Sequence, residues 1–200
     1  MDVIIRQARS EDAEKIAPLI INAIGDIADH MTAQKEPAAV LEKVVGMIRG
    51  EHTRHSHRYT YTATVNGAIA GALVLYHGNQ AAALDRFLIE QLKKQGHYRT
   101  IEPEAHTDEW YIDTVSVDPA CQGQGIGSKL FDFAEELILS QGGGKLSLNV
   151  DIDKEGAIRL YKRLGYSISE PWTIIGEPFH HMVKVISRKA DKASFASDTL

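Results

Sequence analysis

The stretch that decides the fold is residues 115–127, which read Val115-Ser116-Val117-Asp118-Pro119-Ala120-Cys121-Gln122-Gly123-Gln124-Gly125-Ile126-Gly127. A strand-like run precedes it over residues 110–117, and a helical period follows it over residues 128–141. The order is therefore strand, glycine-rich loop, helix. Glycines permit close approach to the backbone, and a helix start presents unpaired N–H groups with a partial positive charge. Together these features predict an anion site suited to a phosphate or diphosphate.

Two widespread nucleotide-binding motifs fit this loop poorly. A P-loop needs Gly-Lys followed by Ser or Thr, whereas Gly127 is followed by Ser128-Lys129 in the reverse order. The dinucleotide fingerprint needs G-x-G-x-x-G, and the spacing here is G-x-G-x-G. Asp151, after the next strand-like run, imitates the acidic residue that binds the ribose in that fingerprint. A nicotinamide dinucleotide is therefore kept as a weaker alternative.

A third pattern fits the loop best. Residues 122–127, Q-G-Q-G-I-G, match a Q/R-x-x-G-x-G/A loop, and V-S-V-D-P at 115–119 matches the apolar-x-Val-x-Pro strand end that precedes such loops. A further strand-like run covers Lys145 to Val150, and residues 157–166 read A-I-R-L-Y-K-R-L-G-Y. In this order the motifs closely resemble the GNAT acetyltransferase superfamily. The close resemblance spans Trp110 to Tyr166.

The resemblance implies a mixed α/β (α+β) fold of GNAT type, with a mostly antiparallel central sheet, one splayed parallel pair and helices on both faces. It also implies acetyl-CoA as the cosubstrate, lying between the strands at 110–117 and 145–150. Backbone groups of Val115, Ser116 and Val117 would hold the pantetheine arm and polarise the thioester. The cofactor-binding loop itself would comprise Gln122, Gly123, Gln124, Gly125, Ile126, Gly127 and Ser128. Lys154 stands where the family often has an asparagine that holds the cofactor, so it is a further candidate contact.

The strand before the loop supplies the candidate base, because an ammonium group must lose a proton before the amine can attack. In the resembled family the base often lies on this strand. Alternation places Tyr111 and Asp113 on one face, and Asp113 is the better base by chemistry, with a structural hydrogen bond as its alternative role. A carboxylate of ordinary pKa acts as a base only when burial or a neighbour raises its pKa, or when water relays the proton. Glu109 and His181 are weaker candidates.

Tyr161 occupies the Leu-Tyr position of the second motif. The resemblance implies that its hydroxyl points toward the sulfur of CoA and protonates the departing thiolate. Ile158, Tyr161 and Leu164 also share one face of a helix, so a core aromatic residue is the alternative role. Tyr161 and Asp113 are therefore the two predicted catalytic residues.

A histidine-rich segment, E-H-T-R-H-S-H-R, covers residues 51–58. His52, His55 and His57 are metal-ligand types, but their spacing matches no standard zinc pattern and no cysteine joins them. We therefore expect a solvated loop and no metal ion.

The length of 200 residues suits one domain. We expect a single acetyltransferase-like domain over residues 1–186, an insertion over about 78–109 and a flexible tail over 187–200. The insertion contains a helical pattern at 81–94. It would either cover a sheet edge or form a lid that shapes the acceptor pocket.

The composition of the chain limits which partners and which cellular compartment we expect. The net charge of −5 argues against nucleic acid, which attracts basic surfaces. The single cysteine, Cys121, excludes an internal disulfide and fits a reducing cytoplasm. Neither a signal-peptide pattern nor an apolar run of membrane-spanning length stands out, so we expect no membrane association. A homodimer is left open.

The predicted function is transfer of the acetyl group of acetyl-CoA to a primary amine, by direct attack in a ternary complex. The acceptor would be a small molecule or a peptide. An acyl-CoA-binding sensor or interaction module without turnover is the alternative from a different class, and the dinucleotide-binding protein is the weaker one.

Overall fold

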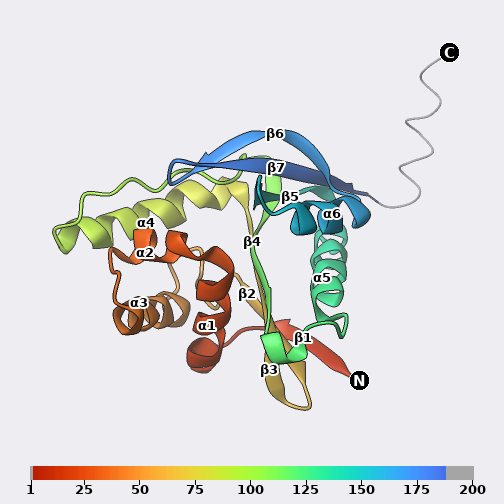
Figure 1. Ribbon diagram of the computed structural model, residues 1–200, viewed down its shortest axis with the longest axis horizontal. Coiled ribbons are helices and arrows are strands. Elements are labelled where there is room, and N and C mark those ends of the chain that lie inside the picture. Colours follow the sequence, from red (N-terminus) through yellow and green to blue (C-terminus); the bar gives the residue numbers. More distant parts are fainter. Residues whose placement is uncertain (1, 188–200) are drawn as a thin grey trace.

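A seven-stranded mixed sheet lies at the centre of the computed structural model, which describes residues 2–187 (Figure 1). The strand order is β1-β2-β3-β4-β5-β7-β6, and every neighbouring pair is antiparallel except β4 with β5. This arrangement confirms the predicted fold class. From residue 188 on, the predicted tail lies outside the described residues. The strands are β1 Val3–Gln7, β2 Thr60–Val65, β3 Ala68–His77, β4 Glu109–Val117, β5 Gly144–Asp151, β6 Ser167–Ile174 and β7 Glu177–Ile186.

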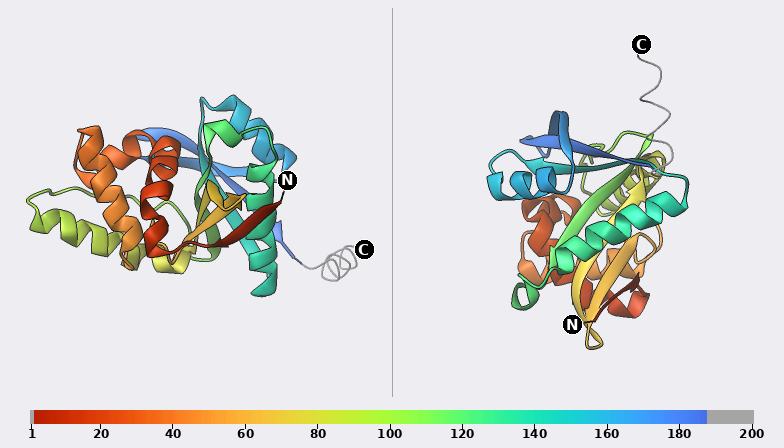
Figure 2. Two further views of the ribbon diagram at one scale, coloured as in Figure 1. Left: turned by 90° about the horizontal axis from the view of Figure 1, so that it is seen from below. Right: turned by 90° about the vertical axis from the view of Figure 1, so that its right-hand side faces the viewer.

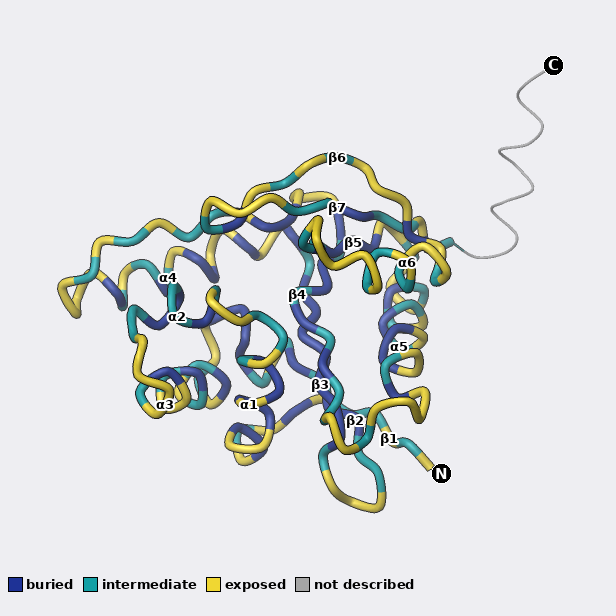
Figure 3. Tube along the Cα trace, viewed as in Figure 1, coloured by how far each residue is buried: buried dark blue, intermediate teal, exposed yellow. Residues whose placement is uncertain are grey.

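Helices cover both faces of the sheet, as Figures 1 and 2 show. They are α1 Ala13–Ile24, α2 Asp26–Thr32, α3 Pro37–Arg49, α4 Ala81–Lys94, α5 Ile126–Ser140 and α6 Glu155–Arg163. Side chains alternate along β3, which is buried over most of its length (Figure 3). Val74 and Tyr76 join the buried cluster under α1 and α3, whereas Leu73 and Leu75 join the cluster under α5 and α6. Within the described residues, no helix is both long and apolar enough to cross a membrane.

The parallel pair β4–β5 separates along its length. The two strands pair only where Glu109, Trp110 and Tyr111 lie opposite residues 145–147. Beyond these residues β4 continues to Val117, paired with β3, and β5 continues to Asp151, paired with β7. The facing edges of β4 and β5 therefore have no strand partner over this part of the described sheet. This is the splay that the sequence resemblance implied.

The histidine-rich segment between α3 and β2 is not a solvated loop, so that prediction was wrong. Residues 53–56 are buried, with Arg54 exposed by only 1%. Hydrogen bonds fold the segment back on the end of α3: the Ser56 hydroxyl donates to the carbonyl of Gly50 at 2.6 Å, and the backbone N–H of His57 donates to the carbonyl of Ile48 at 2.8 Å. The polar segment lies in the interior because buried carboxylates pair with it there: Asp85 and Glu104 with Arg54, and Asp113 with His55.

The helix α4 packs on both the sheet and other helices: Ala81 and Leu84 belong to the buried cluster that contains Val74 and Tyr76 of β3. Its Leu88 and Leu92 form a buried cluster with Met31 of α2, and Met47 of α3 packs against it. The chain then runs back toward β4, and it passes so close to Gly78 that a Cβ there would lie 1.8 Å from the carbonyl oxygen of His106.

The returning segment, residues 95–108, is tied to the β6–β7 hairpin. The indole N–H of Trp172 donates to the carbonyl of Pro103 at 2.9 Å, and the backbone N–H of Ile175 donates to Glu102 at 2.6 Å. These contacts fix the path of the chain around Glu104, whose side chain is buried beside β4.

Candidate active site

Two cavities meet at the splay between β4 and β5. The first has a volume of about 450 Å³ and lies between the α1–α2 junction, β4, β5 and the β6–β7 turn. The second has a volume of about 480 Å³ and follows the glycine loop and α6. Val115 of β4 and Tyr161 of α6 line both cavities. A molecule that lies along the loop can therefore present its end to the first cavity at these two residues.

The glycine loop leaves open space above the start of α5. Gly123 and Gly125 have φ angles of 74° and 76°, a left-handed conformation that favours glycine. A Cβ at either position would meet nothing within 4 Å. The first intrahelical hydrogen bond of α5 comes from the N–H of Lys129 to the carbonyl of Gly125, so the three N–H groups before it have no helical partner. This cradle fits the diphosphate of CoA.

Most of the predicted cofactor-binding residues line the second cavity. These are Val115, Val117, Gln122, Gly123, Gly125, Ile126, Gly127 and Ser128. Ser116 is buried, and its side chain alternates to the opposite face of β4, so only its backbone is available. Gln124 is exposed and lines neither cavity, and Lys154 lines the first cavity and not the second. The roles of these residues in binding stay predictions.

Asp113 lies where the sequence predicts the base, on the same cavity as Tyr111. Its carboxylate accepts hydrogen bonds from His55 Nε2 at 2.9 Å and from the Thr114 hydroxyl at 3.0 Å. Burial alone would raise the pKa of Asp113, but the charge and hydrogen bond of His55, together with Arg54, lower it to about 2. Asp113 is therefore ionised at neutral pH and is a weak base by itself.

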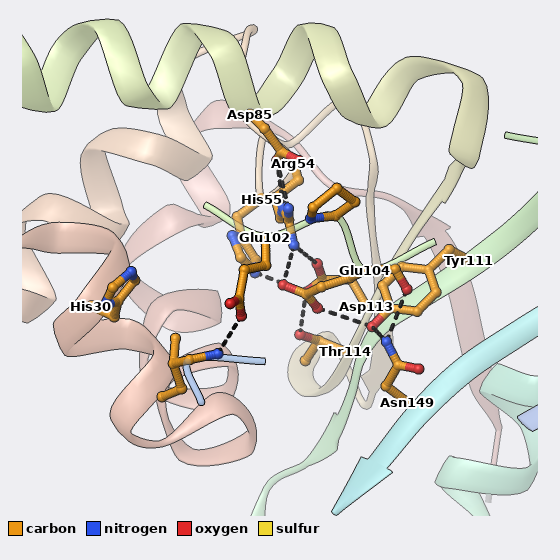
Figure 4. Close-up of polar contacts among 12 residues, drawn as sticks. His30, Arg54, His55, Asp85, Glu102, Glu104, Tyr111, Asp113, Thr114 and Asn149 are labelled. Carbon is orange, nitrogen blue, oxygen red and sulfur yellow. Dashed lines mark hydrogen bonds and ion pairs between the residues drawn. The ribbon is translucent and has the colours of Figure 1, made fainter. Parts of the chain in front are cut away.

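Arg54 is the centre of a buried ion cluster, shown in Figure 4. Its guanidinium lies 2.5 Å from Asp85 and 3.5 Å from Asp113, and it also pairs with Glu104. Burial raises the pKa of Asp85 and of Glu104, although Arg54 opposes the shift in both. Three carboxylates face one guanidinium, so the cluster carries an excess of negative charge beside the first cavity.

Glu104 connects this cluster to β5. It accepts a hydrogen bond from the Tyr111 hydroxyl at 3.0 Å, and that hydroxyl accepts one from Asn149 Nδ2 at 3.2 Å. Asn149 also donates to the backbone carbonyl of Glu104 at 2.8 Å. The network holds the first cavity in shape across the point where β4 and β5 separate.

The two weaker candidates for the base, Glu109 and His181, pair with each other. They lie 3.1 Å apart and are exposed by 2% and 0% of their side chains. His181 Nδ1 also donates to Asn149 Oδ1 at 2.7 Å, and its ring stacks on Trp172. Neither residue lines the two cavities. The geometry therefore fits a structural role at the start of β4.

Tyr161 stands at the junction of the two cavities, and its ring packs against Phe131 and Tyr166. Burial raises the pKa of Tyr161. The ordinary pKa of a tyrosine, about 10, already exceeds that of a thiol, about 8.5, so complete proton transfer to a thiolate is unfavourable. The hydroxyl fits better as a hydrogen-bond donor that stabilises negative charge on sulfur while the C–S bond breaks.

Sequence analysis missed Arg54, His55, Glu104 and Asn149 as residues of this site. Arg54 and His55 belong to a run that has no helical or strand period, and their partners Asp85, Glu104 and Asp113 lie 31, 50 and 58 residues away. The one sequence feature that could have indicated them is the adjacency of Arg54 and His55 in a segment rich in titratable side chains. Within residues 2–187, no group of three or more His, Cys, Asp or Glu side chains is arranged to hold a metal ion.

Comparison with known proteins gives a consistent picture. Residues 26–166 match the model of the family described as "Acetyltransferase (GNAT) family". The chain is 40% identical over 58 residues to the N-alpha-acetyltransferase RimI of Mycobacterium tuberculosis, covering 29% of this chain and 35% of that protein. It is 32% identical over 92 residues to a putative [ribosomal protein bS18]-alanine N-acetyltransferase of Bacillus subtilis, covering 40% and 61%. The chain thus spans less than two thirds of these curated relatives.

Solved structures match over more of the chain. A crystal structure described as an acetyltransferase is 31% identical with a TM-score of 0.76, covering 92% of this chain and all of that one. An N-acetyltransferase from Staphylococcus aureus Mu50 is 27% identical with a TM-score of 0.76, covering 90% and 100%.

Proposed function

The chain belongs to the acetyltransferase (GNAT) family, which implies acetyl-CoA as a cosubstrate, and we propose that it acetylates a primary amine by direct attack in a ternary complex. The observation that carries this proposal is the meeting of two cavities at Val115 and Tyr161. One cavity follows the diphosphate loop, and the other is bordered by carboxylates. The acetyl group would lie at their junction, where the edge of β4 supplies backbone N–H groups that polarise the thioester.

The acceptor is an amine that carries a positive charge in solution. Five carboxylates border the first cavity, among them Glu104, Asp113 and Glu177, and opposite charges attract an ammonium group into such a site. Both small-molecule and peptide amines fit this description. Because two relatives are named for acetylation of an alanine or of an α-amine, a peptide N-terminus is one acceptor to test.

The segment at 78–109 supports a role in acceptor choice. Glu104 borders the first cavity, whereas no residue of the segment borders the second. We propose that this segment, inserted in a single domain over residues 1–186, sets acceptor preference and leaves acetyl-CoA binding alone. We also propose a cytoplasmic location, supported by the single Cys121.

The two alternative functions, a dinucleotide-binding protein and an acyl-CoA sensor, require different features. A dinucleotide-binding protein of the doubly wound type carries its glycine loop on a mostly parallel sheet, whereas in the described sheet only β4 and β5 pair in parallel. An acyl-CoA sensor would bind acetyl-CoA and release no thiol. Turnover therefore separates the enzyme from the sensor.

Replacing Gly127 by valine should weaken acetyl-CoA binding by about tenfold or more, equivalent to about 1.4 kcal/mol. Gly127 is the second residue of α5, and a Cβ there would meet only Val117 Cγ2, at 3.8 Å. The valine therefore fits the folded protein but fills space above the loop. Isothermal titration calorimetry with acetyl-CoA measures the effect.

Gly156→Val is the matched control, since Gly156 is the second residue of α6 and a Cβ there meets nothing within 4 Å. The control should bind acetyl-CoA like the parent protein. Parent-like affinity in folded Gly127→Val would show that the diphosphate does not lie over this loop.

A further inference from the structure

His55 is held firmly at the edge of the first cavity, although it comes from the segment between α3 and β2. Its side chain is exposed by only 3%, yet it borders the cavity. Its backbone is fixed from both sides: Ser56 bonds to Gly50 at the end of α3, and the Thr60 hydroxyl at the start of β2 donates to the carbonyl of Ser56 at 2.9 Å. These bonds anchor the chain next to His55, and the hydrogen bond to Asp113 orients its ring.

The two ring nitrogens of His55 have different environments. Nε2 lies 2.9 Å from Asp113 Oδ1, so the N–H that this carboxylate accepts belongs to Nε2. Nδ1 points away from Asp113, because the two nitrogens diverge across the ring, and it has no hydrogen-bond partner among the described residues. A dashed line in Figure 4 marks the contact between His55 and Asp113. With the proton on Nε2, Nδ1 presents a free lone pair.

We propose that His55 is the base that takes the proton from the acceptor's ammonium group, and that Asp113 is the positioning residue that orients it. This inference rests on the proposed acetyl transfer and names the proton acceptor for it. The arrangement is that of a carboxylate that fixes the tautomer of an imidazole, with the second nitrogen left for proton transfer. His55 lies outside the β4 strand on which sequence analysis placed the base.

The proton balance of the reaction closes with this assignment. The charged amine gives one proton to His55 Nδ1 and becomes the neutral nucleophile. Its nitrogen attacks the thioester carbonyl carbon, the C–N bond forms, and the C–S bond breaks. The second amine proton leaves the nitrogen as the amide forms and passes through solvent to the departing sulfur, to which Tyr161 donates a hydrogen bond. His55 then releases its proton to solvent.

The neighbouring carboxylates serve this role less well. Asp113 is ionised far below neutral pH, its Oδ1 accepts hydrogen bonds from His55 and Thr114, and its Oδ2 lies 3.5 Å from Arg54. Glu104 has one oxygen on Arg54 and the other on the Tyr111 hydroxyl, so neither is free for an amine.

The titratable and charged groups around His55 are Arg54, Tyr76, Asp85, Glu104, Tyr111 and Asp113, with Asp26, Asp151, Lys154 and Glu177 across the cavity.

The test replaces His55 by glutamine, whose amide N–H can still donate to Asp113 while it offers no basic nitrogen. The acceptor is the primary amine that gives the fastest thiol release from acetyl-CoA in a panel of amines. At pH 7, we expect kcat/KM for this amine to fall by about 10²- to 10⁴-fold, with the affinity for acetyl-CoA unchanged. The acidic limb of the kcat/KM–pH profile that reports the base should disappear. Activity should recover as rising pH delivers more uncharged amine.

His57→Gln is the matched control in the same segment, because the His57 ring only bonds to the carbonyl of Ile48, and it should retain parent kcat/KM. Asp113→Asn, a second variant, keeps the base but loosens its position, so it should lose less activity than His55→Gln and keep the acidic limb.

Three outcomes decide the matter. A folded His55→Gln variant with parent-like kcat/KM and the same pH profile would overturn the proposal and pass the role to Glu104 or a water relay. If His55→Gln does not fold, Asp113→Asn decides, because a profile without the acidic limb would make Asp113 the base. A parent protein that releases no thiol with any amine refutes the acetyl transfer itself.

Discussion

Arg54→Met should lower the free energy of unfolding by about 3–5 kcal/mol, the cost of removing one partner from a buried ion pair. The substitution keeps an unbranched chain of similar length and removes the guanidinium that faces Asp85, Glu104 and Asp113. Three buried carboxylates would then repel one another without compensation. Urea denaturation followed by circular dichroism at pH 7 measures the loss.

Arg58→Met is the matched control, because Arg58 pairs with Glu51 at a site where both side chains are more than half exposed. Exposed pairs contribute about 0–1 kcal/mol, so this variant should stay close to the parent. An Arg54→Met variant as stable as Arg58→Met would contradict the buried cluster.

The pH dependence of the same variant has a definite sign. In the parent, burial raises the pKa of Asp85 and Glu104 above their ordinary values, and loss of Arg54 would raise them further. A raised pKa in the folded state means that stability is retained at low pH and lost as the pH rises through that pKa. The deficit of Arg54→Met relative to the parent should therefore shrink as the pH falls from 7 toward 5.

Tyr161→Phe should lower kcat by about tenfold to a thousandfold, within and just below the range for acid–base groups, while acetyl-CoA binding stays near normal. The ring keeps its contacts with Phe131 and Tyr166, and only the hydroxyl at the junction of the two cavities is removed. The measurement is the rate of thiol release in a single turnover, where chemistry limits the rate.

Tyr166→Phe is the matched control from the same aromatic cluster. Its hydroxyl is buried, borders neither of the two cavities and has no hydrogen-bond partner among the described residues, so its removal should leave kcat unchanged. If Tyr161→Phe reacts at the parent rate in a single turnover, the hydroxyl takes no part in the departure of the sulfur.

Local sequence signals suffice for the elements that are defined by their own residues. The Asn66-Gly67 turn joins β2 and β3 as a hairpin with positive φ at both positions. The glycines of the loop mark the start of α5, and Gly50 ends α3. These features depend on backbone conformation and periodicity, which adjacent residues determine.

The polar interior of the site could not be predicted in this way. Polarity predicts exposure for residues 51–58, and only the contacts that Arg54 and His55 make with β4 and α4 turn that segment inward. Asp113 was identified on the correct strand and borders the same cavity as Tyr111, although the β3–β4 register shifts between Ile112 and Thr114, so simple alternation does not hold there. The contact between Asp113 and His55 depends on how two distant segments pack together. No sequence pattern within either segment predicts that packing.

The most direct test of the account is a single assay that quantifies both products. The protein, acetyl-CoA and a panel of primary amines, including a peptide with an N-terminal alanine, are incubated together. Free thiol is measured by a colorimetric reagent, and acetylated amine is measured by mass spectrometry. We expect equal amounts of thiol and acetylated amine, formed only when protein, acetyl-CoA and a suitable amine are all present. Tight binding of acetyl-CoA with no thiol above the amine-free background for any amine would contradict this expectation and favour the sensor.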